Sequence, residues 1–160
     1  MDKFLERLEK VEKFVLKDVV VILLCKDNKI LLQLRDFNEG IIHPGKWGFF
    51  GGSIEKGESP EEAAKRELWE EISYKPKRIH LLGCFKIPTE HNKCAYVYYC
   101  KLDLLLEELK LGEGLDFGLF SSSEIFRPEL YSKKMNKYFP LVSTHFVLST
   151  IKKVLEINNN

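Results

Sequence analysis

The spacing of apolar and polar residues changes along the chain and predicts where its helices lie. Near the start, apolar residues recur every three or four positions with charged residues between them, which is typical of an amphipathic helix. We expect this helix to span residues 1–16 and to pack on the domain or on a second subunit. A second helical period covers residues 141–157, just before a closing Asn-Asn-Asn. The apolar positions of the first helix are Phe4, Leu5, Leu8, Val11 and Val15.

Between these helices lie several segments rich in β-branched and aromatic residues. VVVILLC and ILLQLR flank the polar turn 26–29, a pattern that predicts a hairpin. Residues 36–46, DFNEGIIHPGK, contain two glycines and a proline and indicate a loop. Four further segments have strand character, and they cover residues 47–55, 78–87, 93–103 and 114–121.

A third helix is expected from Pro60 to Ile72. Ser59 can accept hydrogen bonds from the free N–H groups of the first turn, and proline is tolerated there. Glu61 and Glu62 place negative charge at the positive end of the helix.

The order of elements favours a single α/β domain over residues 1–160. At 160 residues and 44% hydrophobic composition, the chain has the size and apolar content of one globular domain. No repeat, low-complexity segment or linker divides it. A mixed β-sheet with helices on both faces is therefore the expected architecture.

Charge and hydropathy narrow the classes of partner. Lys and Arg number 25 against 24 for Asp and Glu, which predicts no broad attraction for nucleic acid or for anionic membranes. The longest apolar run, residues 19–25, is far shorter than the roughly 20 residues of a membrane-spanning helix. The start of the chain also lacks the pattern of a secretory signal. We expect a small-molecule partner and a cytoplasmic protein.

The four cysteines predict neither a zinc site nor a disulfide framework. They form no C-x-x-C pair and do not cluster with the four histidines. Buried, reduced thiols are expected at all four positions, Cys25, Cys84, Cys94 and Cys100.

The chemistry is expected on the helix over residues 60–72. At 100° per residue, Glu67, Glu70 and Glu71 fall within an arc of roughly 100°. Like charges at this spacing destabilise a helix by a few tenths of a kcal/mol per pair, a cost that a bound cation would offset. Oxygen ligands alone suit hard divalent ions such as Mg²⁺. A solvated acidic surface helix remains the alternative for three glutamates taken by themselves.

The wider stretch from Gly52 to Tyr74 resembles the box of the Nudix (MutT-like) hydrolase family, G-x5-E-x7-R-E-U-x-E-E-x-G-U with U a bulky apolar residue. Six fixed positions agree by chance on the order of once in a million starting points. The order of the flanking strands and of the last helix is also similar to the family's. The matching residues are Gly52, Glu58, Arg66, Glu67, Leu68, Glu70, Glu71 and Tyr74.

Two positions depart from the family pattern. Ser73 stands where the family has a glycine, which would end the helix in a left-handed conformation that a residue with a Cβ adopts less readily. We expect a small stability cost and intact chemistry. Phe50 replaces the proline that commonly precedes the Gly-Gly pair.

The resemblance implies a Nudix α/β/α sandwich that requires Mg²⁺, with Mn²⁺ as an alternative. It implies that Glu67, Glu70 and Glu71 bind the metal, with the Gly52 carbonyl and Glu58 as further ligands. Glu70 or a neighbouring residue would also help to deprotonate the attacking water. Arg66 stays protonated and can hold two carboxylates in place with its planar guanidinium. The implied catalytic residues are thus Glu70, Glu67 and Arg66.

Outside the box the sequence offers weaker candidates for substrate binding. Glu113 lies in a late loop, where many family members place a catalytic acid, and Arg35 ends a predicted strand, where it could contact a phosphate. His43 and His91 are expected at the surface. The strand aromatics are expected in the core more than against a substrate base, and they are Trp47, Phe49, Tyr96 and Tyr98.

The leading hypothesis is hydrolysis of a diphosphate bond in a nucleoside diphosphate linked to another moiety. A nucleotide sugar or ADP-ribose is favoured, and a nucleoside triphosphate is also compatible. The alternative is a non-catalytic module of the same fold that senses a nucleotide. The cysteines do not match the pattern of isopentenyl-diphosphate isomerase, and the balanced charge disfavours a cap-removing RNA hydrolase. A homodimer is compatible with the sequence.

Overall fold

The computed structural model describes residues 17–41, 43–86 and 93–159. The predicted helix over residues 1–16 and the expected surface residue His91 lie outside the described residues.

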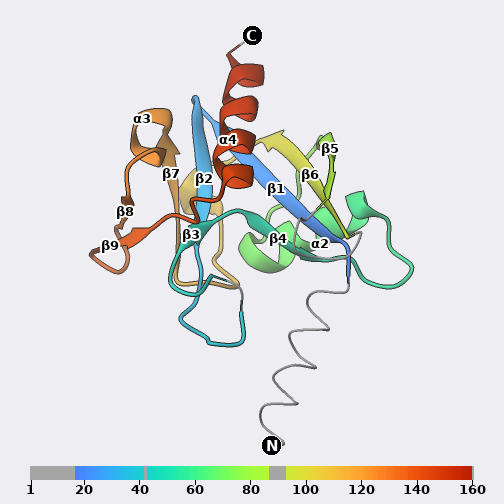
Figure 1. Cartoon of the computed structure of the whole chain (residues 1–160), viewed down its shortest axis with the longest axis horizontal. Helices are drawn as coiled ribbons and strands as arrows, with labels where there is room; N and C mark the ends of the chain where they lie inside the picture. The colour runs from blue at the N-terminus through green and yellow to red at the C-terminus, as the bar shows by residue number, and fades with distance from the viewer. Residues whose placement is uncertain (1–16, 42, 87–92, 160) are drawn as a thin grey trace, which may run out of the picture.

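A mixed β-sheet of seven strands forms the centre of the described part of the molecule (Figure 1). Its central strand, β1 (Val19–Lys26), is antiparallel to β2 (Lys29–Leu34) and β4 (Phe50–Ser53) and parallel to β6 (Cys94–Lys101). Five of the eight β1 side chains are buried, alternately on the two faces of the sheet. This explains the unbroken apolar run, because a strand covered on both faces needs no polar side.

The other strands complete the sheet around this centre. β5 (His80–Lys86) pairs antiparallel with β6 and forms one edge, whereas β3 (Trp47–Gly48) and β7 (Asp116–Ser121) both pair antiparallel with β2. The single strand predicted for residues 47–55 is thus divided in two, because β3 pairs with β2 and β4 pairs with β1.

The predicted hairpin between β1 and β2 is present. Its two turn residues, Asp27 and Asn28, have φ angles of 49° and 58°. A two-residue turn with both residues left-handed matches the twist of antiparallel strands, and Asp and Asn tolerate that conformation.

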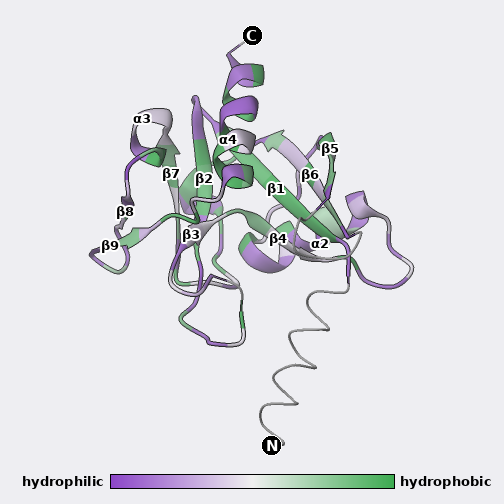
Figure 2. Ribbon diagram, in the orientation of Figure 1, coloured by the Kyte–Doolittle hydropathy of each residue, from purple (hydrophilic) through white to green (hydrophobic). Residues whose placement is uncertain are grey.

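Two helices cover the opposite faces of the sheet (Figure 1). α2 (Pro60–Ile72) buries Ala63, Ala64, Leu68 and Ile72 on one face, and α4 (His145–Asn158) packs on the other. Figure 2 shows the alternation of hydrophobic and hydrophilic residues along α4. The expected α/β architecture with a mixed sheet between helices is confirmed.

α4 begins four residues later than predicted. Leu141 and Val142 are extended instead: Leu141 forms a parallel bridge with Trp47, and Val142 N–H donates to the Trp47 carbonyl at 2.9 Å. Thr144 caps the helix by accepting from Val147 N–H at 3.3 Å. The helical spacing of apolar residues extends to Leu141 and Val142, before the cap, and therefore did not reveal where α4 begins.

Several short elements between β6 and α4 were not predicted. They are a turn of 3-10 helix η1 (Leu106–Glu108), the helix α3 (Ser122–Ile125) and a hairpin of β8 (Glu129–Ser132) with β9 (Lys137–Pro140). The hairpin carries a tertiary contact, because the Leu130 carbonyl accepts the indole N–H of Trp47 at 3.0 Å. The expectation that Trp47 belongs to the core is confirmed.

The prediction of four buried cysteines is wrong for two of them. Cys25 and Cys100 are buried, but Cys84 is exposed and Cys94 half-buried. Both lie where β5 and β6 form the edge of the sheet, and this pairing was not readable from the sequence. No helix in the described ranges is long and apolar enough to cross a membrane.

α2 has the predicted bounds because both ends are capped. Ser59 and Glu62 form a reciprocal capping box at its start, with N–H to oxygen distances of 3.2 and 2.7 Å. At its end Ser73 adopts a left-handed conformation with φ 53° and donates its N–H to the Trp69 carbonyl at 2.9 Å. Ser73 thus takes up the conformation that a glycine would adopt at lower cost.

Replacing Ser73 with glycine is therefore expected to raise the free energy of unfolding by about 1 kcal/mol, since the left-handed conformation then carries no Cβ penalty. Urea denaturation measures the change. Ser73→Ala is the control, because it keeps the Cβ and should bring no gain. Equal stability of the glycine and alanine variants would contradict the explanation.

Candidate functional site

Glu71 is a buried carboxylate on the inner side of α2. Its residue is only 3% exposed. One carboxylate oxygen accepts from Gln33 Nε2 at 2.9 Å and the other from Gly51 N–H at 3.0 Å. Burial raises the pKa of Glu71 to about 8, an effect that the hydrogen bond from Gln33 opposes and the nearby Glu67 reinforces. A carboxyl with such a pKa is poised to ionise when a cation approaches.

Glu67 lies one turn earlier and faces strand β4. It is 9% exposed, and burial raises its pKa against the lowering effect of Arg66. Its carboxylate fills the space that a side chain at Gly52 would need, because a Cβ built there would lie 2.3 Å from Glu67 Oε1. The glycine is therefore required for Glu67 to take this position.

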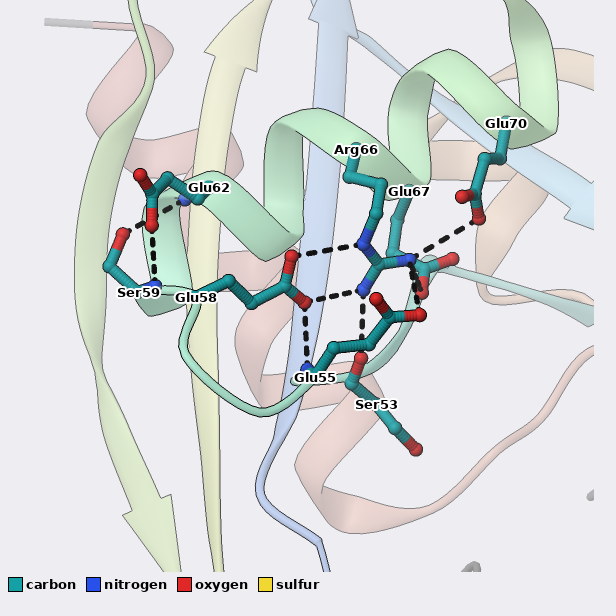
Figure 3. Close-up of polar contacts among 8 residues, drawn as sticks. All are labelled: Ser53, Glu55, Glu58, Ser59, Glu62, Arg66, Glu67 and Glu70. Atoms are coloured by element: carbon teal, nitrogen blue, oxygen red, sulfur yellow. Dashed lines mark hydrogen bonds and ion pairs between the residues drawn. The ribbon is translucent and has the colours of Figure 1, made fainter.

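Arg66 contacts three glutamates of the box, Glu58, Glu67 and Glu70 (Figure 3). Its guanidinium makes two hydrogen bonds to Glu58, at 3.0 and 2.6 Å, and donates to Glu67 Oε1 at 2.9 Å. A further contact reaches Glu70 Oε2 at 3.3 Å, and Nη2 donates to the Ser53 carbonyl at 3.0 Å. The hydrogen bonds to Glu58 raise the pKa of Arg66 and lower that of Glu58. The guanidinium thus contacts three carboxylates at once, and the catalytic role of Arg66 stays a prediction.

The residues predicted to bind a metal lie in one region, but their side chains do not all point to one common position. Glu70 is the most accessible, with 47% of its side chain exposed. Both carboxylate oxygens of Glu58 accept hydrogen bonds from Arg66, and one of them also accepts from Glu55 N–H at 2.7 Å. Across the described ranges, no group of three Asp, Glu, His or Cys side chains has the arrangement of a metal site.

The residues nevertheless fit a hard divalent cation. Glu67 raises the pKa of the buried Glu71, Glu70 and Glu113 raise that of Glu67, and the two oxygens of Glu67 lie against Gly52. A cation would remove this electrostatic cost, and an oxygen-only donor set is what Mg²⁺ or Mn²⁺ prefers.

The loop over residues 110–115 places Glu113 beside these carboxylates. On one side Gly112 N–H donates to the Glu71 carbonyl at 2.7 Å, and on the other Leu115 N–H donates to the Leu34 carbonyl at 2.8 Å. Gly112 must be a glycine, because a Cβ there would lie 2.1 Å from the Glu70 carbonyl oxygen. The exposed Glu113 between these anchors raises the pKa of Glu67 and Glu71.

A basic group lies at the same end of the sheet. Arg35 and Lys46 continue the pairing of β2 with β3, and Arg35 N–H donates to the Lys46 carbonyl at 3.0 Å. The Arg35 side chain is half-buried, which lowers its pKa, while Glu71 and Glu113 act in the opposite direction. Its Nε has no hydrogen-bond partner among the described residues. This Nε is itself buried, so its N–H is an unsatisfied donor at this end of the sheet.

Sequence reasoning missed two residues of this region, Gln33 and Lys46. Gln33 binds Glu71, Lys46 lies opposite Arg35, and Lys46 and Arg35 contribute, after burial, to the lowered pKa of the exposed His43. The expectation of a surface position for His43 is confirmed. Gln33 had a usable signal, as the one polar residue within ILLQL. The position of Lys46 opposite Arg35 depended on strand register.

The family model of the NUDIX domain matches residues 15–142. The chain belongs to the Nudix family. The match contains the whole box together with Arg35 and Glu113, so the residues assembled here come from the part of the chain that defines the family.

Curated relatives of this Nudix chain match over part of their length. It is 38% identical to an RNA pyrophosphohydrolase of Psychromonas ingrahamii, over 40% of this chain and 33% of that protein. It is also 38% identical to an ADP-ribose pyrophosphatase of Methanocaldococcus jannaschii, over 55% of this chain and 51% of that protein. The chain thus spans between a third and about half of these relatives.

Solved structures show the same fold at low identity. The NUDIX domain of Shewanella oneidensis NrtR, complexed with ADP ribose, has a TM-score of 0.64 at 19% identity and covers 89% of this chain and 88% of its own. A MutT NUDIX hydrolase from Burkholderia pseudomallei has a TM-score of 0.59 at 20% identity and covers 86% and 97%.

Gly52→Ala is expected to disturb the Nudix site without unfolding the domain. The added methyl group would displace the Glu67 carboxylate, so we expect Mg²⁺ affinity to fall by tenfold or more. Isothermal titration with Mg²⁺ measures this, and Gly57→Ala is the control. A Cβ at Gly57 has nothing within 4 Å, although its φ of 89° carries some backbone strain. Unchanged Mg²⁺ affinity of Gly52→Ala would contradict the proposed position of the cation.

The pKa of Glu71 predicts how stability without metal depends on pH. Because its pKa is raised from 4.5 to about 8 in the folded chain, the folded state binds more protons between these values. The free energy of unfolding should therefore fall as pH rises through this window, by at most about 1.4 kcal/mol per pH unit. Glu71→Gln removes this contribution.

Urea denaturation in EDTA at pH 5.5, 7.0 and 8.5 compares the two proteins. The wild type should lose more stability than Glu71→Gln as pH rises, and the difference isolates Glu71 from other titrating groups such as His43. Parallel pH profiles would show that Glu71 ionises normally.

Proposed function

We propose that this chain is a Mg²⁺-dependent hydrolase that cuts a diphosphate bond in a nucleoside diphosphate linked to another moiety. The observation that carries the proposal is the pair of buried carboxylates, Glu67 against Gly52 and Glu71 on Gly51 N–H, with Arg35 and Glu113 nearby. Burying two acids together is costly. That cost is offset when a divalent cation binds between them.

Glu67, Glu70 and Glu71 would hold the cation, with Mn²⁺ as an alternative to Mg²⁺, and the Gly52 carbonyl and Glu58 as further ligands. When bound, the ion would neutralise the diphosphate and lower the pKa of an attacking water. Arg66 fixes the direction of Glu67 and Glu70. Glu70 and Glu113 are the exposed carboxylates of this group and can accept a proton from water.

Arg35 is proposed to bind the diphosphate. Its unpaired Nε and its position beside Lys46 supply positive charge next to the acidic face of α2. Arginine holds phosphate oxygens with its planar set of donors. A diphosphate can thus lie between the cation on the carboxylate side and Arg35 on the other.

A nucleotide sugar or ADP-ribose is the favoured substrate, with a nucleoside triphosphate as the next candidate. Supporting this order, the match to the ADP-ribose pyrophosphatase extends over 91 residues, compared with 73 for an oxidized purine nucleoside triphosphate hydrolase of Danio rerio. The NrtR domain of similar fold is complexed with ADP ribose. A small-molecule partner without nucleic acid, a homodimer and a cytoplasmic location stay predictions.

The first experiment measures release of phosphate and mononucleotide, with Mg²⁺ and with EDTA. The panel contains nucleotide sugars, ADP-ribose, dinucleoside polyphosphates and nucleoside triphosphates. We expect Mg²⁺-dependent cleavage of ADP-ribose or a nucleotide sugar. Tight binding of a panel member without cleavage would contradict the hydrolase and support the nucleotide-sensing alternative.

Glu70→Gln tests the role of the exposed glutamate. The amide keeps the shape of the side chain but can neither bind Mg²⁺ as an anion nor accept a proton, so turnover should fall about a hundredfold or more. Glu61→Gln is the matched control on the same helix, because Glu61 lies in the first turn of α2 and pairs there with Lys65 at 2.6 Å. It should stay within twofold of wild type. A fully active Glu70→Gln protein would exclude the assigned role.

A further inference from the structure

A basic hollow lies on the face of the sheet opposite to the carboxylates. It is open to solvent, has a volume of about 530 Å³ and lies between the edge strand β5, its neighbour β6 and the last turn of α4. Its lining includes Lys77, Arg78, His80, Tyr99 and Lys101. We propose that this hollow binds a mononucleotide, with the phosphate held by Arg78 and Lys101 and the base against His80 and Tyr99.

The hollow is separated from the Nudix site by the sheet itself. Tyr99 packs against the core cluster under α4, and His80 lies directly opposite Tyr99 in the β5–β6 pairing. Lys101 follows two residues after Tyr99 and so projects to the same face. Helix α2, which carries the buried Glu67 and Glu71, covers the other face (Figure 1). A ligand in the hollow cannot contact them, so the inference is independent of the proposed hydrolysis.

Positive charge is concentrated here although the chain as a whole is nearly neutral. Three cationic side chains, Lys77, Arg78 and Lys101, line the hollow against one carboxylate, Asp103, which leaves a net charge of +2. The whole chain carries only +1. The C-terminal end of α4 adds about half a negative charge nearby, too little to neutralise the cluster.

Among the residues that the structure describes, Lys77 is the only one of the three cations with an ion-pair partner. Lys77 forms an ion pair with Asp103 at 2.9 Å, and Asp103 also accepts from the Tyr74 hydroxyl at 2.8 Å. In the part of the chain that the structure describes, no carboxylate lies within 4.0 Å of the charged groups of Arg78 or Lys101. A phosphate would accept charge-assisted hydrogen bonds from both and relieve their repulsion.

The aromatic pair and the size of the hollow favour a nucleotide over a simple anion. The rings of His80 and Tyr99 are stacked, with centroids 5.3 Å apart and 28° between their planes, and His80 is exposed. An exposed stacked ring can extend its stack onto a nucleobase. Small-ligand sites typically have about 300–1,000 Å³, whereas a nucleic acid strand would need a longer basic track.

The test titrates AMP and inorganic phosphate into the ¹⁵N-labelled full chain in EDTA and follows backbone amide shifts. Three proteins are compared: the wild type, Arg78→Glu/Lys101→Glu, and the control Lys152→Glu/Lys153→Glu. The control changes exposed lysines of α4 outside the hollow and alters the net charge equally. The amide spectrum itself shows whether each variant is folded. If the charge-reversal variant does not fold, Arg78→Gln/Lys101→Gln takes its place.

We expect AMP to shift residues 77–80 and 99–103 in the wild type and to bind at least fivefold more tightly than phosphate. Charge reversal should weaken AMP binding tenfold or more, and the control should stay within twofold of wild type. Equal losses in both variants, equal affinities for AMP and phosphate, or AMP shifts confined to the region of Arg35 would each overturn the proposal. Tighter binding of a single-stranded oligonucleotide, with shifts beyond the lining, would also overturn it in favour of a nucleic acid.

Hydrolysis of the substrate panel is measured on the same proteins with Mg²⁺. Arg78→Glu/Lys101→Glu should keep wild-type turnover, because neither residue lies on the carboxylate face. A loss of turnover in this variant with normal AMP binding would overturn the independence of the two sites. Absence of hydrolysis in every protein would count against the proposed function alone and leave the AMP result to stand by itself.

Discussion

The burial of Glu71 is the constraint on which the geometry of the site depends. Its two carboxylate oxygens accept hydrogen bonds from Gln33 on β2 and from Gly51 on β4, so one side chain of α2 is tied to two strands. Gln33 also donates to the Phe49 carbonyl at 3.0 Å, between β3 and β4. These bonds satisfy the polar atoms of the carboxyl, but burial still raises its pKa. Glu71 thus fixes the position of α2 on the sheet, and its carboxylate is also a group that a cation would stabilise.

Glycines allow the segments next to α2 to pack closely around these glutamates. Gly52 leaves room for Glu67, and Gly112 lets the loop before β7 approach the end of α2 closely enough for its N–H to bond the Glu71 carbonyl. Gly114 meets the same need on the other side of Glu113, with φ 84° and the Leu34 carbonyl oxygen only 2.8 Å from where a Cβ would lie. At each of these positions a side chain would clash, so only glycine lets the backbone lie this close to its neighbours. The position of Glu113 is therefore set by backbone packing more than by its own contacts.

How far the sequence predicted this arrangement depended on whether the signal was local. α2 was predicted with its observed bounds because Ser59, Pro60 and Glu62 specify its start within four residues. The start of α4 was missed because Leu141 and Val142 fit a helical period yet pair with Trp47, distant in the sequence. The box glutamates were recognisable by spacing. Gln33 and Lys46 were not recognised, because their roles follow from strand register, which a single sequence does not specify.

The charges of the two faces of the sheet differ in a way that their surroundings explain. On the α2 face, acids are buried and held by Arg66, Gln33 and backbone N–H groups, so the unbalanced charge is negative and inward. On the α4 face, the unpaired cations sit at an exposed strand edge where β6 ends, and their excess is positive and outward. A chain of net charge +1 thus keeps two regions of opposite sign apart by a sheet whose core is apolar on both sides. Because the packed sheet keeps them apart, the two regions cannot pair through direct contact, and each is left to interact with a ligand of opposite charge.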